Sequence, residues 1–167
     1  MPKDNQSELF YLVDDEDQVL GSVSRLEAHQ SQAIKHRSVF ILIFNDKDEL
    51  LLQKRSQNKD TFPGFWTLSA SGHVNYGQSY DEAAKRELRE EVGLEINLEP
   101  LHKTYVSEER EFCFVYQGKF LDDKEIKFDQ DEVEKIQWVN KDNLKQFIKE
   151  NKMTPAAMVV LRELRYL

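Results

Sequence analysis

Residues 72–94 read GHVNYGQSYDEAAKRELREEVGL, and this stretch predicts a single helix with an acidic face. Strong helix formers occupy residues 78–92, and Gly93 supplies the stop that is expected just beyond a last turn. At about 100° of rotation per residue, three carboxylates share one side of this helix: Glu87, Glu90 and Glu91. The sequence therefore predicts a concentration of negative charge on one helix face.

Carboxylates gathered on one face repel each other, and this repulsion predicts a bound cation. Glu87 and Glu91 form a like-charge i,i+4 pair, which costs about 0.2–0.5 kcal/mol. A hard divalent cation such as Mg²⁺ or Mn²⁺ takes oxygen ligands and offsets this cost, and its remaining positions bind substrate phosphates. An adjacent apolar stripe would seat the helix on a sheet: Ala84, Leu88 and Val92. The competing interpretation is a solvated helix that carries favourable i,i+4 ion pairs.

The spacing within the stretch favours metal binding over a solvated helix. Eight positions fit Gly-x5-[Glu]-x7-Arg-Glu-aliphatic-x-Glu-Glu-x-Gly-aliphatic: Gly72, Arg86, Glu87, Leu88, Glu90, Glu91, Gly93 and Leu94. With ordinary residue frequencies, such a match arises by chance at a given start about once in 10⁸. The pattern resembles the signature of the Nudix superfamily.

This resemblance implies a fold, a reaction and residue roles. It implies a mixed-sheet α/β/α sandwich, and typically Mg²⁺- or Mn²⁺-dependent hydrolysis of a diphosphate in a nucleotide-like or related small molecule. By resemblance, the helix glutamates at positions 87, 90 and 91 are metal ligands, and Arg86 orients a carboxylate through a charge-assisted hydrogen bond. One position departs, because Gln78 replaces the first glutamate of the pattern and its amide brings no charge to a cation.

A longer stretch, from about residue 29 to residue 138, resembles type I isopentenyl-diphosphate isomerase. Its matching segments include AHQSQAIKHR, LLLQKRSQNKDTFPGFWT, SASGH and REFC. By that resemblance a second metal site has five ligands: His29, His36, His73, Glu109 and Glu111. Glu109 and Glu111 stand two apart on a predicted strand, so we expect both on one face. Taken singly, each histidine is more typical of a hydrogen-bonded or surface residue than of a ligand.

The parts specific to the isomerase are incomplete in this chain. The family cysteine before Gly-His is Ser71 here, and a hydroxyl is far less acidic than a thiol. The family tryptophan after Thr-Pro is Ala156, which has no aromatic face to stabilise a cation. Arg55 and Lys59 match basic residues that bind the diphosphate in the isomerase, the alternative being a solvated loop.

We therefore expect a one-domain Nudix hydrolase of the isomerase-like branch. Its predicted catalytic carboxylates are Glu90, Glu91 and Glu132, the last in the acidic loop FDQDEVEK over residues 128–135. The general base is Glu91 or Glu132, because related enzymes often recruit the base from a loop outside the helix. Two other hypotheses stay open at this point. One is an active isomerase, and the other is an inactive module that binds diphosphates.

The remaining sequence predicts strands on both sides of the acidic helix. The expected strands are residues 9–14, 18–25, 37–45, 50–55, 67–74, 94–107, 110–121 and 136–139, the first two and the next two forming hairpins. The continuous β-branched and aromatic run of residues 37–45 predicts a strand that is buried on both faces. Two more helices are expected over residues 142–149 and 155–164. This order indicates an α/β or α+β protein with a mixed sheet. We expect an N-terminal hairpin extension over residues 1–30 and a Nudix domain over residues 31–167.

Composition excludes several classes of protein. The chain has 167 residues, enough for one core, and its net charge of −8 provides no basic surface for nucleic acid. Its single cysteine, Cys113, excludes an internal disulfide and suits a reducing compartment. No apolar run approaches a membrane span or a signal peptide, so we expect a cytoplasmic protein. The edge of the N-terminal hairpin suggests a homodimer contact.

Overall fold

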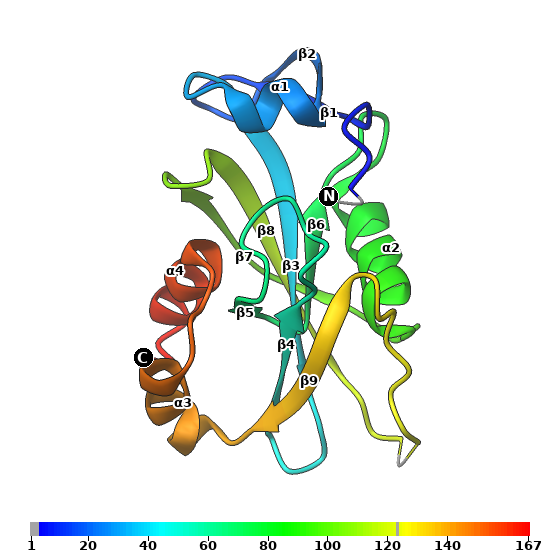
Figure 1. Cartoon of the computed structure of the whole chain (residues 1–167), viewed down its shortest axis with the longest axis vertical. Coiled ribbons are helices and arrows are strands. Elements are labelled where there is room, and N and C mark those ends of the chain that lie inside the picture. The colour runs from blue at the N-terminus through cyan, green and yellow to red at the C-terminus, as the bar shows by residue number, and fades with distance from the viewer. Residues whose placement is uncertain (1–3, 123) are drawn as a thin grey trace.

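A mixed β-sheet forms the centre of the computed structural model, which describes residues 4–122 and 124–167 (Figure 1). Within these residues the sheet has seven strands: β3 (His36–Phe44), β4 (Leu50–Arg55), β5 (Trp66–Thr67), β6 (Ala70–His73), β7 (Glu99–Val106), β8 (Glu111–Lys119) and β9 (Val133–Val139). The path β5-β4-β3-β8-β7 is extended by β6 beside β3 and by β9 beside β4. The β3–β8 pair is parallel and the other pairs are antiparallel, which confirms the predicted mixed sheet.

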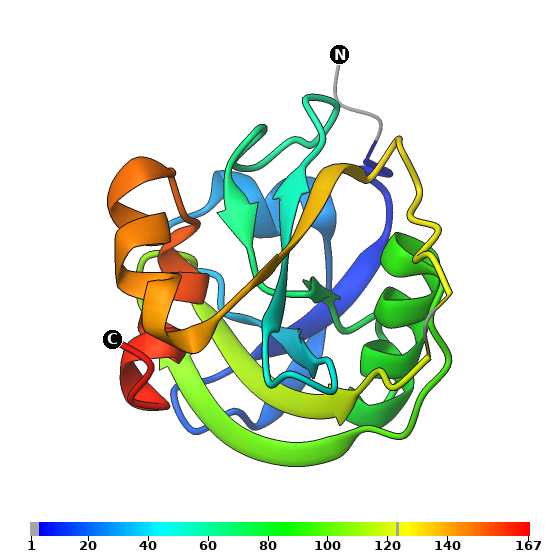
Figure 2. The ribbon, with the colours of Figure 1, turned by 90° about the horizontal axis from the view of Figure 1, so that it is seen from below.

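Helices cover both faces of this sheet (Figure 2). On one face lies α2 (Tyr80–Val92), and on the other lie α3 (Leu144–Glu150) and α4 (Pro155–Glu163). The strand β3 contributes to both interfaces, because its side chains alternate between the two faces. Phe40, Leu42 and Phe44 join the core under α3 and α4, and Val39, Ile41 and Ile43 join the core under α2. The sandwich of three layers is therefore confirmed, and so is the fully buried strand.

The N-terminal segment forms the predicted hairpin and, in addition, a short helix that we did not predict. The hairpin consists of β1 (Leu9–Val13) and β2 (Val19–Ser24). We expected strand character to continue to Arg25, but α1 (Arg25–Gln30) begins there. Ser24 and Glu27 form a reciprocal capping box at its start, so the Ser-x-x-Glu pattern was the missed signal. This segment lies across one end of the sheet (Figure 1).

The predicted hairpin of β3 and β4 is paired at one position only. Phe44 and Leu50 face each other beside the turn, after which β6 takes the place next to β3. The expected strand over residues 67–74 is two strands, because β5 pairs with β4 and β6 pairs with β3. Ser69 lies between them, donating to Leu51 O at 2.7 Å and accepting from Ile43 N at 2.8 Å. The Ser69 hydroxyl therefore bridges β3 and β4 at the point where these two strands separate.

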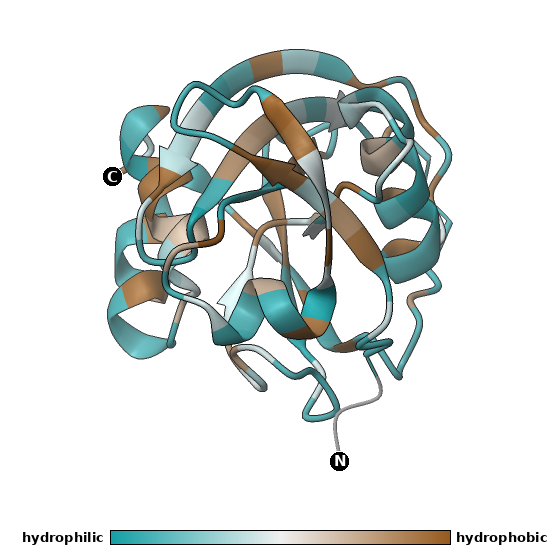
Figure 3. Cartoon of the chain, turned by 90° about the horizontal axis from the view of Figure 1, so that it is seen from above, coloured by the Kyte–Doolittle hydropathy of each residue, from teal (hydrophilic) through white to brown (hydrophobic). Residues whose placement is uncertain are grey.

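Other boundaries differ by a few residues. The helix α2 begins at Tyr80 rather than at residue 78, because Ser79 caps it, and it ends at Gly93 in the left-handed conformation. Residues 94–98 are not a strand, and β9 begins at Val133, earlier than expected. Apolar colour follows the central strands, while the helices alternate apolar with polar stretches (Figure 3). Among the residues described, no helix has the length and apolar character that a membrane crossing requires.

Candidate active site

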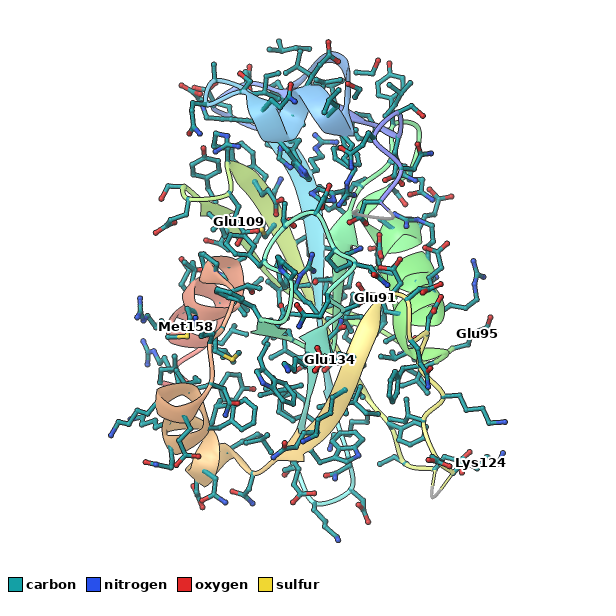
Figure 4. All side chains as sticks on the ribbon, viewed as in Figure 1. Glu91, Glu95, Glu109, Lys124, Glu134 and Met158 are labelled. Carbon is teal, nitrogen blue, oxygen red and sulfur yellow. The ribbon has the colours of Figure 1, made fainter. Side chains whose placement is uncertain are left out.

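A cavity opens at the end of the sheet where the N-terminal segment, β6, α2 and the β7–β8 turn meet. Six of the predicted metal ligands line it: His29, His73, Glu87, Glu91, Glu109 and Glu111. The two predicted phosphate-binding residues, Arg55 and Lys59, line it as well. In Figure 4, Glu91 on the α2 side and Glu109 beside β8 lie on opposite sides of the central strands. The structure thus brings most of the predicted site residues to one place.

Glu91 is buried in the cavity wall and is held there from two strands. Its Oε2 accepts a hydrogen bond from Gln53 Nε2 of β4 at 2.5 Å and another from Ser71 N of β6 at 3.0 Å. Among the described residues, no hydrogen bond reaches its second oxygen, Oε1. One oxygen is therefore fixed by the protein, and the other is left to bind an ion or to take a proton.

Glu87 lies against a glycine and beside an arginine. A Cβ added to Gly72 would come within 2.1 Å of Glu87 Oε1, so a larger residue at this position of β6 would force the Glu87 carboxylate to move. Arg86 Nη1 donates to Glu87 Oε1 at 2.7 Å and to Glu90 Oε2 at 3.1 Å, and Arg86 Nη2 donates to His73 O at 2.7 Å. Gln78, which replaces the first glutamate of the sequence pattern, accepts a hydrogen bond from Arg86 Nε at 3.2 Å. Arg86 therefore links the helix carboxylates to β6.

The protonation of the two buried glutamates reflects their surroundings. Burial, followed by the charge of Glu91, raises the pKa of Glu87 to about 8. Burial also raises the pKa of Glu91 to about 7, against the opposing effect of Lys59. Glu90 differs from both, because its side chain is 53% exposed and does not line the cavity. A cation between Glu87 and Glu91 would relieve the cost of ionising the pair.

Three histidines and one glutamate converge beside these helix carboxylates. They come from four elements: His29 from α1, His36 from β3, His73 from β6 and Glu111 from β8. His29 Nε2 and His73 Nε2 are 3.2 Å apart, and Glu111 Oε1 lies 3.2 Å from His36 Nε2 and 3.1 Å from His73 Nε2. The ligand atoms of the histidines all lie within 4.8 Å of one another. This group can hold a metal ion.

The protonation states of His73 and Glu111 suit metal binding. Burial lowers the pKa of His73 to about 3, so its ring is neutral at ordinary pH. Burial alone would raise the pKa of Glu111, but hydrogen bonds from His36 and His73 hold it well below its usual range. Neutral imidazoles and an ionised carboxylate are the forms that bind a metal.

Glu109 departs from the expected arrangement. It lies in the turn before β8 rather than on the strand, so the expectation that it shares a strand face with Glu111 is wrong. Its Oε1 accepts a hydrogen bond from Ala156 N, in the first turn of α4, at 2.9 Å. Burial, with the charge of Glu111, raises its pKa to about 7. Glu109 still lines the cavity, but it is hydrogen-bonded to α4 rather than to a histidine.

The two predicted basic residues of the cavity differ in their hydrogen-bond partners, which are carboxylates for Lys59 and a neutral residue for Arg55. Lys59 Nζ contacts Asp4 Oδ1 and Glu132 Oε2, each at 2.6 Å. Arg55 donates to Thr61 O through Nε at 3.1 Å and through Nη2 at 2.9 Å. Glu132 itself does not line the cavity and is tied to it through Lys59.

The sequence analysis missed one basic residue of the cavity, Arg25, and its carboxylate partner, Asp60. Arg25 of α1 donates to Asp60 through Nε and Nη2, each at 2.8 Å, and also lies 3.4 Å from Asp4 Oδ1. Asp60 Oδ2 in turn lies 3.5 Å from His29 Nδ1. The sequence analysis did not predict α1, and it is this helix that places Arg25 and His29 one turn apart on the same face.

Sequence comparison places the chain among two groups of relatives. A family model described as the NUDIX domain matches residues 34–163. The chain is 36% identical over 140 residues to isopentenyl-diphosphate Delta-isomerase 2 of Photorhabdus laumondii, covering 80% of this chain and 77% of that protein. It is 33% identical over 138 residues to an uncharacterized Nudix hydrolase of Pseudomonas aeruginosa, covering 81% and 80%.

Structural comparison agrees with the sequence relatives. The crystal structure of DR0079 from Deinococcus radiodurans matches with a TM-score of 0.78 and 26% identity, covering 93% of this chain and 98% of that one. A MutT protein from Methanosarcina mazei matches with a TM-score of 0.60 and 28% identity, covering 77% of this chain and 90% of that one. The likeness to DR0079 extends over nearly the whole of both chains.

Proposed function

Because the chain belongs to the NUDIX domain family, we propose that it is a Nudix hydrolase that cleaves a diphosphate linkage in a small molecule, with Mg²⁺ or Mn²⁺ as cofactor. The observation that carries this proposal is the burial of Glu87 and Glu91 together in a cavity that basic side chains also line. Burying two like charges side by side is costly, and such arrangements cluster at functional sites.

The residues of the cavity fit a hard divalent cation. Carboxylate oxygens are the ligands that Mg²⁺ and Mn²⁺ prefer. The pKa values of Glu87 and Glu91 stay raised although Arg86 and Lys59 lower them, so the neighbouring cations offset the cost of burying this pair only in part. We assign Glu87 and Glu91 as the principal ligands, with Glu90 at the outer edge of the same helix face. An ion bound there polarises diphosphate oxygens and lowers the pKa of an attacking water.

The protein's own groups supply orientation and proton transfer. Gln53 and Ser71 saturate Glu91 Oε2, so Glu91 Oε1 is our first choice as proton acceptor. Glu132 is the second, because it contacts Lys59, which lines the cavity. Arg55 and Lys59 would bind phosphate oxygens, and Arg86 keeps Glu87 in place.

The cluster of His29, His36, His73 and Glu111 is proposed as a second metal site. Imidazole nitrogens favour transition metals more than Mg²⁺, so Mn²⁺ or another transition metal suits this site. Glu109 would join it only by exchanging its hydrogen bond to Ala156 N.

A substrate panel tests the proposal. We would assay phosphate release from nucleoside diphosphate sugars, dinucleotides, deoxynucleoside triphosphates and isoprenoid diphosphates, with and without Mg²⁺. We expect Mg²⁺-dependent release from at least one class, and a loss of about a hundredfold or more in E91Q. The control is E95Q, since Glu95 lies beyond the end of α2 and points away from the sheet (Figure 4). Wild-type turnover in E91Q at saturating Mg²⁺ would remove both proposed roles of Glu91.

Isomerisation of isopentenyl diphosphate is the competing activity, and the histidine cluster favours it. The geometry around the substituted positions argues the other way. Ser71 lines the cavity with its N–H bonded to Glu91, and Ala156 provides only a backbone N–H to Glu109. Incubation with isopentenyl diphosphate in deuterated water distinguishes the two. Dimethylallyl product or deuterium uptake would establish the isomerase, and binding without any product would indicate a non-catalytic module.

A further inference from the structure

Arg110 lies in the turn before β8 and lines the cavity, although no resemblance assigned it a role. Among the described residues, its guanidinium makes one hydrogen bond, from Nη1 to the amide oxygen of Gln32 at 3.2 Å. Its Nε is buried and has no partner. A buried donor without an acceptor is costly, which makes this atom a candidate for binding a ligand.

The two carboxylates next to Arg110 in the sequence are hydrogen-bonded to other groups. Its neighbour Glu109 is bonded to the first turn of α4, and its neighbour Glu111 is bonded to His36 and His73. In the part of the chain that the structure describes, the Arg110 guanidinium forms no ion pair with a carboxylate, although Glu108 also lines the cavity. The positive charge of Arg110 is therefore not neutralised by the protein.

The other cations of the cavity divide into two kinds. Arg25 and Lys59 are each paired with carboxylates, Asp60 and Asp4 respectively among them. Arg55 resembles Arg110, because among the described residues it donates its hydrogen bonds to the neutral residue Thr61. Arg55 ends β4, whereas Arg110 precedes β8. Among the described residues, the cavity thus has two guanidinium groups, from different elements, whose hydrogen-bond partners are neutral; Arg55 also lowers the pKa of Glu91 and Glu109 through its charge.

The backbone fixes Arg110 in an unusual conformation. Its φ of 56° lies in the left-handed region, which side chains other than glycine and asparagine rarely adopt. Its carbonyl accepts from His36 N at 3.2 Å, and its N–H donates to Ser107 O at 3.3 Å. Strained positions of this kind cluster at functional sites.

From these observations we infer that Arg110 is a specificity-determining residue, which binds an anionic group of the substrate beyond the scissile diphosphate. The substrate class that this favours is an ester with a chain of at least three phosphates. The inference rests on the proposed function, since it takes Arg55 and the metal-bound carboxylates as the site of the diphosphate. A guanidinium suits this role because it donates several hydrogen bonds in a fixed plane.

Calorimetric titration with inorganic tripolyphosphate and inorganic pyrophosphate, both in excess Mg²⁺, tests the inference. We expect the wild-type protein to bind tripolyphosphate about tenfold more tightly than pyrophosphate. R110Q should lose about tenfold in tripolyphosphate affinity and less than about twofold in pyrophosphate affinity, with partial recovery in R110K. The control is R89Q, because the Arg89 side chain is 59% exposed on α2.

Equal losses for both anions in R110Q, no loss for either, or no binding of tripolyphosphate by the wild type would overturn the inference. If R110Q does not fold, R110N replaces it, because asparagine tolerates a positive φ. Failure of the proposed hydrolase gives a different result. In that case the substrate panel releases no phosphate, while the preference for tripolyphosphate and its dependence on Arg110 remain.

Discussion

Gln53 on β4 donates a hydrogen bond from Nε2 to Oε2 of Glu91 on α2 at 2.5 Å, across the interface between sheet and helix. The Gln53 side chain is buried, and its partner Glu91 lines the cavity. This bond lowers the pKa of Glu91, although burial, the largest effect, raises it to about 7. Gln53 thus keeps the proposed base closer to its ionised form.

Replacing Gln53 with leucine should weaken activity near neutral pH. Without the hydrogen bond the pKa of Glu91 rises further, so we expect the acidic limb of the pH–rate profile to move up by about one unit. Turnover would fall about tenfold at neutral pH and recover in alkaline buffer. The control is Q57L, because Gln57 bonds to the exposed Glu134. An unchanged profile in Q53L would show that Gln53 does not tune Glu91.

The metal affinity of the helix site should rise with pH. The folded-state pKa values of about 8 for Glu87 and about 7 for Glu91 exceed ordinary values, so the folded protein holds extra protons and loses stability as pH rises through this window. A divalent ion must displace these protons. We therefore expect Mg²⁺ to raise the melting temperature more at about pH 8.5 than at about pH 6. Equal increments in thermal-shift measurements at both pH values would contradict this.

Neutralising Glu87 should stabilise the protein while it removes activity. In E87Q the like-charge contact with Glu91 disappears, and the amide oxygen still accepts from Arg86. For metal-free protein in mildly alkaline buffer we expect a melting temperature about 2–4 °C higher than that of the wild type. The same variant should lose the Mg²⁺-induced shift. E95Q, at an exposed site, should change neither quantity, and a lower melting temperature in E87Q would argue against repulsion at this site.

The space beside Gly72 provides a prediction that couples two residues. G72A places a Cβ within 2.1 Å of Glu87 Oε1, so we expect a loss of about 1–3 kcal/mol in the free energy of unfolding and a loss of turnover. Shortening the opposing side chain should relieve the clash. Denaturant unfolding of G72A, E87A and the double variant forms a thermodynamic cycle, in which G72A should cost less in the E87A background. Strict additivity would mean that the two residues do not compete for space.

The helices and strands could be predicted because hydrophobic periodicity and helix caps depend on residues that are close in the sequence. The pattern over residues 72–94 predicted both the helix α2 and the family, and the apolar run of β3 predicted a strand buried on both faces. The strand pairing was harder. Insertion of β6 beside β3 depends on contacts such as those of Ser69, which join residues distant in sequence.

The site residues that a motif places on one helix could be predicted from the sequence. Those whose positions depend on tertiary contacts were harder to predict. Spacing alone brought Glu87 and Glu91 together, but it did not reveal that Glu90 is half-exposed or that Glu109 bonds to α4. The pairing of Arg25 with Asp60 also escaped prediction, because the predicted strand ended at Arg25 and the helix α1 that begins there was not predicted. Such contacts depend on where whole elements come to lie.

The N-terminal segment provides a last prediction, because Asp4 pairs with Lys59 and Arg25, two cavity cations that an anionic substrate would contact. Its carboxylate accepts from Lys59 Nζ at 2.6 Å and lies 3.4 Å from Arg25 Nη2. In D4N the amide oxygen still accepts from the N–H of Asp60, which donates to Asp4 at 2.8 Å, but the negative charge is gone. We expect KM for a diphosphate substrate to fall about two- to fivefold with kcat unchanged.

Steady-state kinetics of D4N beside D15N separates competition from positioning. Asp15 is a suitable control, because its side chain is 78% exposed and pairs with Lys35, and neither residue lines the cavity. If Asp4 competes with substrate, only D4N lowers KM, and the effect shrinks as ionic strength rises because salt screens the removed charge. A rise in KM would instead mean that Asp4 holds Lys59 in the orientation that the phosphate requires, since the lysine then loses a support rather than a competitor.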